Sequence, residues 1–171
     1  TIKKHKIDML IVGPEEPLVN GIVDYLKEDK ELQSLKIIGP NAKGAMLEGS
    51  KEFAKDFMIK YGIPTAKSQT VTMDNLEESL KSMERIDPPF VLKADGLAGG
   101  KGVIITEELP EARKALRGLV EDKQFGEASE KVLIEHFLHG IEVSFFVLTD
   151  GKDYRILPEA KDYKRIGEKD T

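Results

Sequence analysis

Apolar and polar positions follow two different periods in the first part of the chain. A compact apolar run at Ile7–Val12 is followed by Gly13-Pro14, and apolar residues at 18, 19, 22, 23 and 26 then recur at helical spacing. Lys36–Gly39 forms a second short apolar run. The pattern predicts a strand, one helix over Leu18–Lys27 and a second strand. A unit of this length implies a parallel strand pair with a right-handed crossover.

The next segment reads as two helices. Asn41 can cap a short helix over Asn41–Leu47, and Ser50 can cap a longer one that ends at Gly62. We expect the apolar residues of the longer helix to form a buried stripe and its lysines to be surface charges. Only Lys51, at the helix start, is placed to reach a ligand. The stripe comprises Phe53, Ala54, Phe57, Met58 and Tyr61, and the other two lysines are Lys55 and Lys60.

From Ile63 the pattern predicts a compact α+β module. Periodicity and turn residues predict strands over 68–72, 90–95, 103–106 and 131–137, and helices over 75–83 and 111–120. A further strand over 142–149, a turn at Asp150-Gly151 and a strand over 154–157 form a predicted hairpin.

The segment Lys93–Gly102 holds four glycines and two lysines between two predicted strands. Glycine lets backbone N–H groups approach a ligand, and lysines supply point charges for phosphate oxygens. A Walker A loop is excluded, because Asp95 stands at its first glycine, Gly102 at its hydroxyl position, and a strand follows. A dinucleotide fingerprint fails at Ile105. We therefore expect a loop that closes over a nucleotide polyphosphate; the alternative is a glycine-rich hairpin with solvated lysines.

Composition narrows the functional classes. Of the 171 residues 33% are charged, and the net charge is −5, which argues against general nucleic-acid or membrane-surface binding. The chain has no cysteine, so disulfides and thiolate chemistry are excluded, and a cytoplasmic location is expected. No apolar run approaches the ~20 residues of a membrane span. The first residue is Thr1 rather than Met, and we expect a piece of a longer chain.

Other charged residues leave their roles open. Glu135 lies late in a strand, seven residues before Glu142, and the pair could hold ribose hydroxyls or be solvated. His136 and His139 are too irregularly placed to indicate zinc, and no acidic metal cluster is visible. The cluster Asp162–Arg165 is either a solvated face or a contact for an anionic substrate.

Seven collinear stretches resemble the ATP-grasp superfamily and, more closely, the family of phosphoribosylamine–glycine ligases (glycinamide ribonucleotide synthetases). The likeness covers nearly the whole chain. The stretches are Val12–Leu18, Leu47–Met58, Tyr61–Ala66, Lys93–Val103, Phe125–Ala128, Ile134–Glu142 and Ser144–Gly151. Two departures stand out: Gly99 replaces an alanine of the family loop, and Tyr163 replaces a histidine in Lys161–Arg165.

The resemblance implies roles for particular residues. Lys93 and Lys101 would be catalytic, Lys51 and Lys93 would bind phosphates, and Glu142 would take the ribose hydroxyls. The strand ending at Glu135–Leu138 would read adenine through its backbone. The implied nucleotide-binding residues are Lys51, Lys93, Gly96, Gly99, Gly100, Lys101, Gly102, Glu135, His136, Leu138 and Glu142, and the implied substrate-binding residues are Gly13, Pro14, Glu15, Asp162, Lys164 and Arg165.

The resemblance also implies a mixed α/β and α+β architecture in four segments. Residues 1–47 would be the C-terminal part of a Rossmann-like pre-ATP-grasp domain with a parallel sheet, and 48–62 a connecting helix of the ATP-grasp domain. Residues 63–137 would be its lid subdomain, and 138–171 the start of its large subdomain.

The implied activity joins glycine to 5-phosphoribosylamine with ATP and Mg²⁺, through a glycyl phosphate, in purine biosynthesis. The Mg²⁺ ligands are expected outside these residues, the parent is expected to be a monomer or homodimer, and the isolated chain is expected to be inactive. Three alternatives stay open. They are another ATP-grasp carboxylate–amine ligase or biotin carboxylase-like enzyme, a non-catalytic nucleotide-binding module, and a plain α/β domain.

Overall fold

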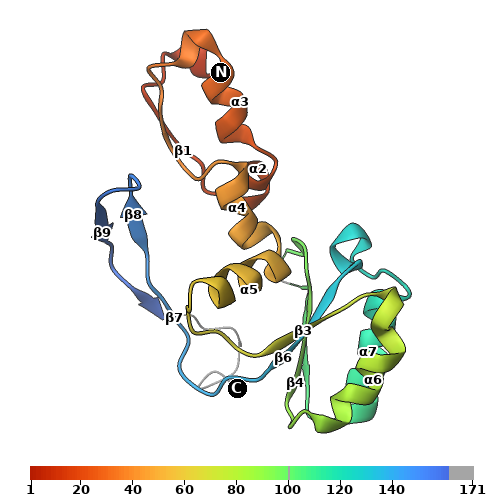
Figure 1. Ribbon diagram of the computed structural model, residues 1–171. Helices are drawn as coiled ribbons and strands as arrows, with labels where there is room; N and C mark the ends of the chain where they lie inside the picture. Colours follow the sequence, from red (N-terminus) through yellow and green to blue (C-terminus); the bar gives the residue numbers. More distant parts are fainter. Residues whose placement is uncertain (100, 162–171) are drawn as a thin grey trace. The chain divides into compact units, whose positions relative to one another are not determined.

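The computed structural model describes residues 1–99 and 101–161 of the chain (Figure 1). Its contacts divide the chain into two units, Thr1–Phe137 and Leu138–Thr171. The first unit holds a small parallel strand pair with its helices and a larger antiparallel sheet. The described part of the second unit, residues 138–161, contains short strands.

The N-terminal elements form the predicted parallel pair. β1 (Met9–Ile11) pairs with β2 (Lys36–Ile38) in parallel, with Leu10 opposite Ile37. Between them lie α2 (Glu15–Val19), α3 (Ile22–Glu28) and a 3₁₀ turn, and α1 (Ile2–His5) precedes them. Val23 and Leu26 of α3 are buried, as their helical spacing predicts.

The single helix predicted over Leu18–Lys27 is wrong. The chain forms two helices that are separated at Asn20-Gly21, because Gly21 adopts a left-handed conformation with φ +82°. Glycine adopts this conformation without a steric penalty, so it can interrupt a helix that the apolar spacing alone would continue. Directly after the Gly13-Pro14 pair, α2 begins at Glu15, three residues before the predicted helix start.

The larger sheet has four strands in the order β3-β6-β4-β5, all antiparallel. Figure 1 shows α6 and α7 on one side of this sheet. The strands are β3 (Ser68–Val71), β4 (Phe90–Ala94), β5 (Val103–Thr106) and β6 (Val132–His136), and the helices are α6 (Leu76–Ser82) and α7 (Leu109–Val120).

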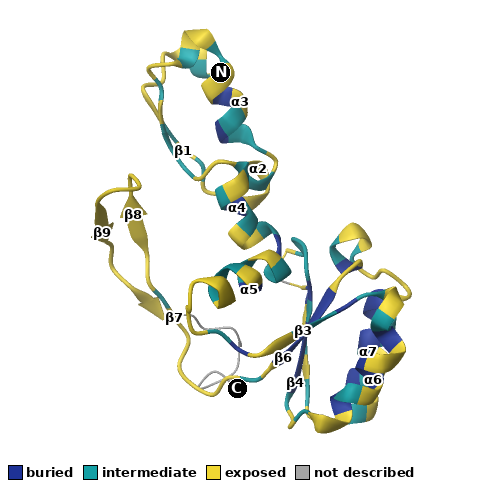
Figure 2. Cartoon of the chain, in the orientation of Figure 1, coloured by how far each residue is buried: buried dark blue, intermediate teal, exposed yellow. Residues whose placement is uncertain are grey.

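Alternate residues of β4 and β6 face opposite sides of the sheet, as the twofold period of a strand requires. Phe90 and Leu92 join the hydrophobic core with Val132 and Ile134, packed against Leu80, Leu116 and Leu119 of the helices. Figure 2 shows this buried side of α6 and α7 in dark blue. Val91 and Lys93, opposite Glu135 and Leu133, therefore lie on the other face of the sheet.

Both predicted helix caps between the two sheets are confirmed. Asn41 accepts a hydrogen bond from Gly44 N–H at the start of α4 (Ala42–Gly49), and Ser50 Oγ accepts one from Phe53 N–H at the start of α5 (Lys51–Lys60). The predicted buried stripe of α5 is wrong, because Phe53 is 37% exposed and Tyr61 is 60% exposed. The buried residue of this helix is Lys55.

The second unit contains two strand pairs. β8 (Val147–Thr149) and β9 (Tyr154–Ile156) form the predicted hairpin around Gly151, whose φ is +92°. The continuous strand predicted over 142–149 is wrong: β7 (Val143–Ser144) is separate and pairs antiparallel with β10 (Ala160–Lys161). Within the described residues no helix has the length and apolar character needed to cross a membrane.

Candidate functional site

Lys93 and Glu135 form the central ion pair of the candidate site. They lie on neighbouring strands β4 and β6, on the sheet face opposite α6 and α7, in a diagonal cross-strand relationship. Lys93 Nζ is 2.7 Å from Glu135 Oε2, and 29% of the Lys93 side chain is exposed against 7% of Glu135. The carboxylate is thus buried, while the ammonium group retains access to solvent.

Lys55 contacts the same carboxylate from α5. Its Nζ lies 3.4 Å from Glu135 Oε1 and donates hydrogen bonds to Thr65 Oγ1 at 2.7 Å and to Ala66 O at 2.9 Å. The expectation that Lys55 is a solvated surface charge is therefore wrong. The side chain is buried because an ion pair and two hydrogen bonds replace its contacts with water.

Lys51 begins α5 and contacts the start of the glycine-rich loop. Its Nζ donates to the carbonyl oxygens of Asp95 and Gly96, both at 3.2 Å. Burial lowers the pKa of Lys51 below its ordinary value, and repulsion by Lys93 adds to the lowering. The carboxylates of Asp95, Glu48 and Glu135 attract the ammonium group and oppose this shift.

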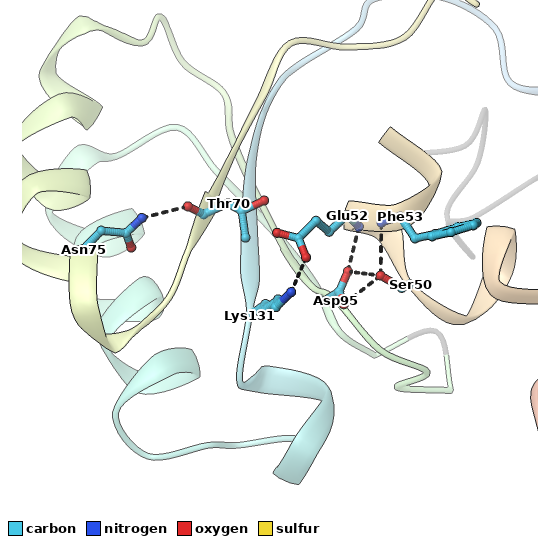
Figure 3. A network of polar contacts seen from close by, with 7 residues as sticks. All are labelled: Ser50, Glu52, Phe53, Thr70, Asn75, Asp95 and Lys131. Atoms are coloured by element: carbon cyan, nitrogen blue, oxygen red, sulfur yellow. Dashed lines mark hydrogen bonds and ion pairs between the residues drawn. The ribbon is translucent and has the colours of Figure 1, made fainter. Parts of the chain in front are cut away.

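Asp95 fixes the first turn of α5 (Figure 3). Its carboxylate accepts a hydrogen bond from Glu52 N–H at 2.7 Å and from Ser50 Oγ at 3.0–3.1 Å. Ser50 Oγ in turn accepts from Phe53 N–H, and the Glu52 side chain forms an ion pair with Lys131 just before β6. A carboxylate at a helix N-terminus satisfies unpaired N–H groups and interacts favourably with the helix dipole.

Glycine is required in the loop for a different structural reason at different positions. A Cβ on Gly96 would lie 2.9 Å from Ala128 Cβ and 3.0 Å from Ala128 Cα, and a Cβ on Gly102 would lie 2.7 Å from Ala98 Cβ. Both positions thus require glycine for close packing. Gly99 instead adopts a left-handed φ of +56° in open space. The exposed Lys101 lies between Gly99 and Gly102 and donates its N–H to Ala98 O, whereas Gly100 lies outside the described residues.

The other residues expected at a site lie in other parts of the chain. His136 ends β6, is exposed, and donates its N–H to Lys67 O. Pro14 is the N-cap of α2 and Glu15 its first residue, after Gly13. Leu138 and Glu142 are exposed residues of the second unit. Asp162, Lys164 and Arg165 lie outside the described residues.

Sequence reasoning missed two residues of the cluster, Lys55 and Asp95. The spacing of Lys51 and Lys55 carried a signal, because residues four apart share one face of a helix. An apolar stripe with an outward lysine was the more economical interpretation of the same pattern. Asp95 follows the strand at the first position of the loop, where a short acidic side chain can cap a neighbouring helix.

The arrangement suits the binding of a polyanion. Lys55 and Lys93 share one carboxylate, that of Glu135, and Lys51 contacts main-chain carbonyl oxygens. This lysine cluster of Lys51, Lys55 and Lys93 therefore keeps a net positive charge next to the glycine-rich loop. Val103 and Ile105 of β5 are exposed at 43% and 52% and share the sheet face of Lys93 and Val91. Among the described residues no group of three or more His, Asp or Glu side chains could hold a metal ion.

Two family models match the chain. Residues 49–171 match the model described as phosphoribosylglycinamide synthetase, ATP-grasp (A) domain, and residues 1–48 match that of the N domain of the same synthetase. The phosphoribosylamine–glycine ligase of Fusobacterium nucleatum is 47% identical over 168 residues, which are 98% of this chain and 38% of that protein. The chain therefore spans well under half the length of this curated relative.

Solved structures show the same likeness. The phosphoribosylamine–glycine ligase of Thermotoga maritima superposes with a TM-score of 0.72 at 37% identity, over 96% of this chain and 38% of that one. The biotin carboxylase domain of 2-oxoglutarate carboxylase from Hydrogenobacter thermophilus, solved with MgADP and bicarbonate, gives a TM-score of 0.66 at 25% identity over 92% of this chain and 35% of that one.

Proposed function

The chain belongs to the phosphoribosylglycinamide synthetase family, and on this premise we propose that the full-length protein is an ATP-dependent ligase. It joins glycine to 5-phosphoribosylamine and gives glycinamide ribonucleotide, ADP and phosphate in purine biosynthesis. The observation that carries the proposal is the lysine cluster at the sheet face opposite α6 and α7, placed where β4 enters the glycine-rich loop.

The first chemical step transfers the γ-phosphoryl group of ATP to the glycine carboxylate. The amine of phosphoribosylamine then attacks the glycyl carbonyl carbon, and phosphate leaves. Both steps require that charge on the transferred group is stabilised and that water is kept from the acyl phosphate. Lys51 and Lys93 supply positive charge for the phosphates, and the loop with Gly96, Gly99 and Gly102 covers them, with Lys101 on its closing edge.

The adenosine part of ATP needs apolar surface and hydrogen bonds beside those charges. Val103 and Ile105 provide exposed apolar surface on the sheet face that carries Lys93. The backbone at the end of β6, from Glu135 to Leu138, reads adenine in this proposal, and Glu142 takes the ribose hydroxyls. The Glu135 side chain is occupied by two lysines and acts on Lys93 rather than on the base.

The substrate side rests on the family alone. We assign Gly13, Pro14 and Glu15, together with Asp162, Lys164 and Arg165, to the phosphoribosylamine side of the cleft. Residues 1–47, 48–62, 63–137 and 138–171 correspond in this proposal to the pre-ATP-grasp part, the connecting helix, the lid subdomain and the start of the large subdomain. Mg²⁺ chemistry belongs to the family, but the described residues offer no cluster that fits the ion, so its ligands are expected elsewhere in the protein.

The test is ADP release by the full-length protein with ATP and Mg²⁺, adding glycine and freshly generated phosphoribosylamine separately and together. Release that requires both acceptors, and that is lost in Lys93→Ala, is the expected result. Lys60→Ala, which removes an exposed lysine from the end of α5, is the matched control and is expected to keep full activity.

Two outcomes would replace the proposal. ADP release with bicarbonate or another carboxylate, and not with glycine, would move the protein to another ATP-grasp branch, for which the likeness to the biotin carboxylase domain is the supporting observation. ATP binding without acceptor-dependent release would indicate a nucleotide-binding module. Full activity of the isolated 171 residues would leave the ligase assignment intact and contradict only the expectation that the isolated chain is inactive.

A further inference from the structure

Lys55 is a buried charged residue that the proposed chemistry does not use. It is 8% exposed, and its ammonium group has three partners: Thr65 Oγ1, Ala66 O and Glu135 Oε1. A lysine ammonium carries three donors, so these partners use all of them. Lys55 therefore has no donor left for a nucleotide, and any role in the site must act through Glu135.

Glu135 is shared between two lysines of unequal exposure. Oε1 faces Lys55, with 10% of its side chain exposed, and Oε2 faces Lys93, with 29% exposed. One carboxylate offsets the charge of one ammonium group. With the buried Lys55 as its counter-charge, Glu135 can hold Lys93 in place by a hydrogen bond while the pair of lysines keeps a net positive charge at the more exposed Lys93.

Lys55 also connects three parts of the fold. It extends from α5, bonds to Thr65 and Ala66 in the segment that leads into β3, and reaches Glu135 on β6, which is the strand paired with β3. A buried ion pair is often no more stabilising than apolar side chains of similar size. Stability alone therefore gives little reason for a lysine at this position, whereas the charge balance at Lys93 does.

We propose that Lys55 is a positioning residue: it holds and neutralises Glu135, so that Lys93 is fixed on the sheet face with its positive charge available to ATP phosphate oxygens. The inference rests on the proposed function, because it assigns Lys93 to ATP. In this proposal Lys55 contacts neither nucleotide nor substrate, and it affects nucleotide binding through the carboxylate of Glu135.

The test compares ATP binding by the full-length protein in a charge-balanced set of variants, with calorimetric Kd and separate kcat and KM for ATP. In Lys55→Met, Glu135 is left to Lys93 alone, and the Kd for ATP is expected to rise about tenfold, the loss of one charged hydrogen bond. The double variant Lys55→Met/Glu135→Gln removes one charge of each sign and is expected to recover most of that affinity. Lys60→Met on the same helix is the control without effect.

If Lys55 is purely structural, the opposite result is expected. The double variant Lys55→Met/Glu135→Gln, which also changes the buried partner Glu135, would then bind ATP no better than Lys55→Met. That result would overturn the proposal, as would a Lys55→Met protein that binds ATP with the affinity of the wild type. If Lys55→Met does not fold, Thr65→Val removes one acceptor of Lys55 with little change in volume. It is then expected to raise the Kd for ATP about threefold, and an unchanged Kd would refute the positioning role.

The same assay separates this inference from the proposed function. A wild-type protein that binds ATP but releases no ADP with glycine and phosphoribosylamine would overturn the ligase assignment. The ATP affinities of the charge-balanced set would still decide the role of Lys55. If the wild-type protein is active and Lys55→Met binds ATP with the same affinity, the ligase assignment stays intact and the inference is overturned.

Discussion

The backbone N–H and the side-chain ammonium of Lys51 both donate to the same acceptor, the carbonyl oxygen of Asp95. Each donor–acceptor distance is 3.2 Å. The carboxylate of Asp95 in turn accepts from Glu52 N–H and Ser50 Oγ. The first residue of the glycine-rich loop is thus bound through its main chain and its side chain to the first turn of α5. Gly96 is held as well, by Lys51 Nζ on its carbonyl oxygen and by its own N–H on Ala128 O, so movement of the loop must begin after Gly96.

Asp95→Ala is expected to destabilise the protein by about 2 kcal/mol, because it removes a charged acceptor from a helix N-terminus. Asp95→Asn keeps an oxygen for Glu52 N–H and is expected to lose less than half of that amount. Urea denaturation followed by circular dichroism measures both. Unfolding midpoints equal to that of the wild type would show that the carboxylate does not cap α5.

Gly96→Ala is expected to destabilise the loop anchor by about 1–3 kcal/mol, the usual cost of overpacking, because the new Cβ would meet Ala128 Cα at 3.0 Å. A main-chain atom cannot move aside as a flexible side chain can. Gly140→Ala is the matched control, since a Cβ there meets nothing within 4 Å. Thermal unfolding of both variants is the measurement, and equal shifts would contradict the packing argument.

The lowered pKa of Lys51 predicts a pH dependence of ATP binding. Burial lowers this pKa below the ordinary 10.5, so the ammonium group loses its proton, and its attraction for phosphate, before an exposed lysine would. ATP affinity is expected to fall as the pH rises toward 10.5, and Lys51→Arg, which stays charged, is expected to resist that fall. Calorimetry across the alkaline range measures it, and superimposable profiles would refute the assignment.

The same shift has a defined sign for stability. Because the folded-state pKa is the lower one, the unfolded chain binds more protons between the two pKa values. The contribution of Lys51 to stability therefore rises with pH across that window. The cost of burying its charge is fully present below the folded-state pKa and is gone above 10.5.

Leu116→Ala is expected to lower the free energy of unfolding by about 2–5 kcal/mol, because Leu116 of α7 is fully buried in the core. The ATP affinity of the folded fraction is expected to stay unchanged, since α7 packs on the sheet face opposite Lys93. Denaturation and calorimetry on one preparation test both statements. A large loss of affinity in folded protein would show that the two faces are coupled.

Local signals predicted much of the fold correctly. Asn41 and Ser50 cap helices as their side-chain chemistry indicates, β1 and β2 pair in parallel, and Asp150-Gly151 closes a hairpin. The caps and the hairpin turn depend on a few neighbouring residues, and the parallel pairing follows from the strand–helix–strand order, so the sequence contains what is needed to predict them. The break at Gly21 shows the limit, because glycine tolerates a helix and a left-handed turn alike.

The candidate site depended on contacts that are distant in sequence. The sequence alone predicts Lys55 as a surface residue. Its partner Glu135 is eighty positions later and comes close to it only because β6 pairs with β3 and β4. The spacing within α5 carries no information about that partner. The loop itself was recognised from composition, but the packing reasons for Gly96 and Gly102 required the positions of Ala128 and Ala98.

The alternation along β6 constrains how the gene can change. Ile134 belongs to the hydrophobic core and Glu135 to the lysine cluster, so the deletion of one codon within this strand would turn the carboxylate toward α7 and an isoleucine toward Lys93. Both the folding of the domain and its charge pattern would fail in one event. Length variation among homologues should therefore fall in the connecting loops, while β4 and β6 keep their residue count through evolution.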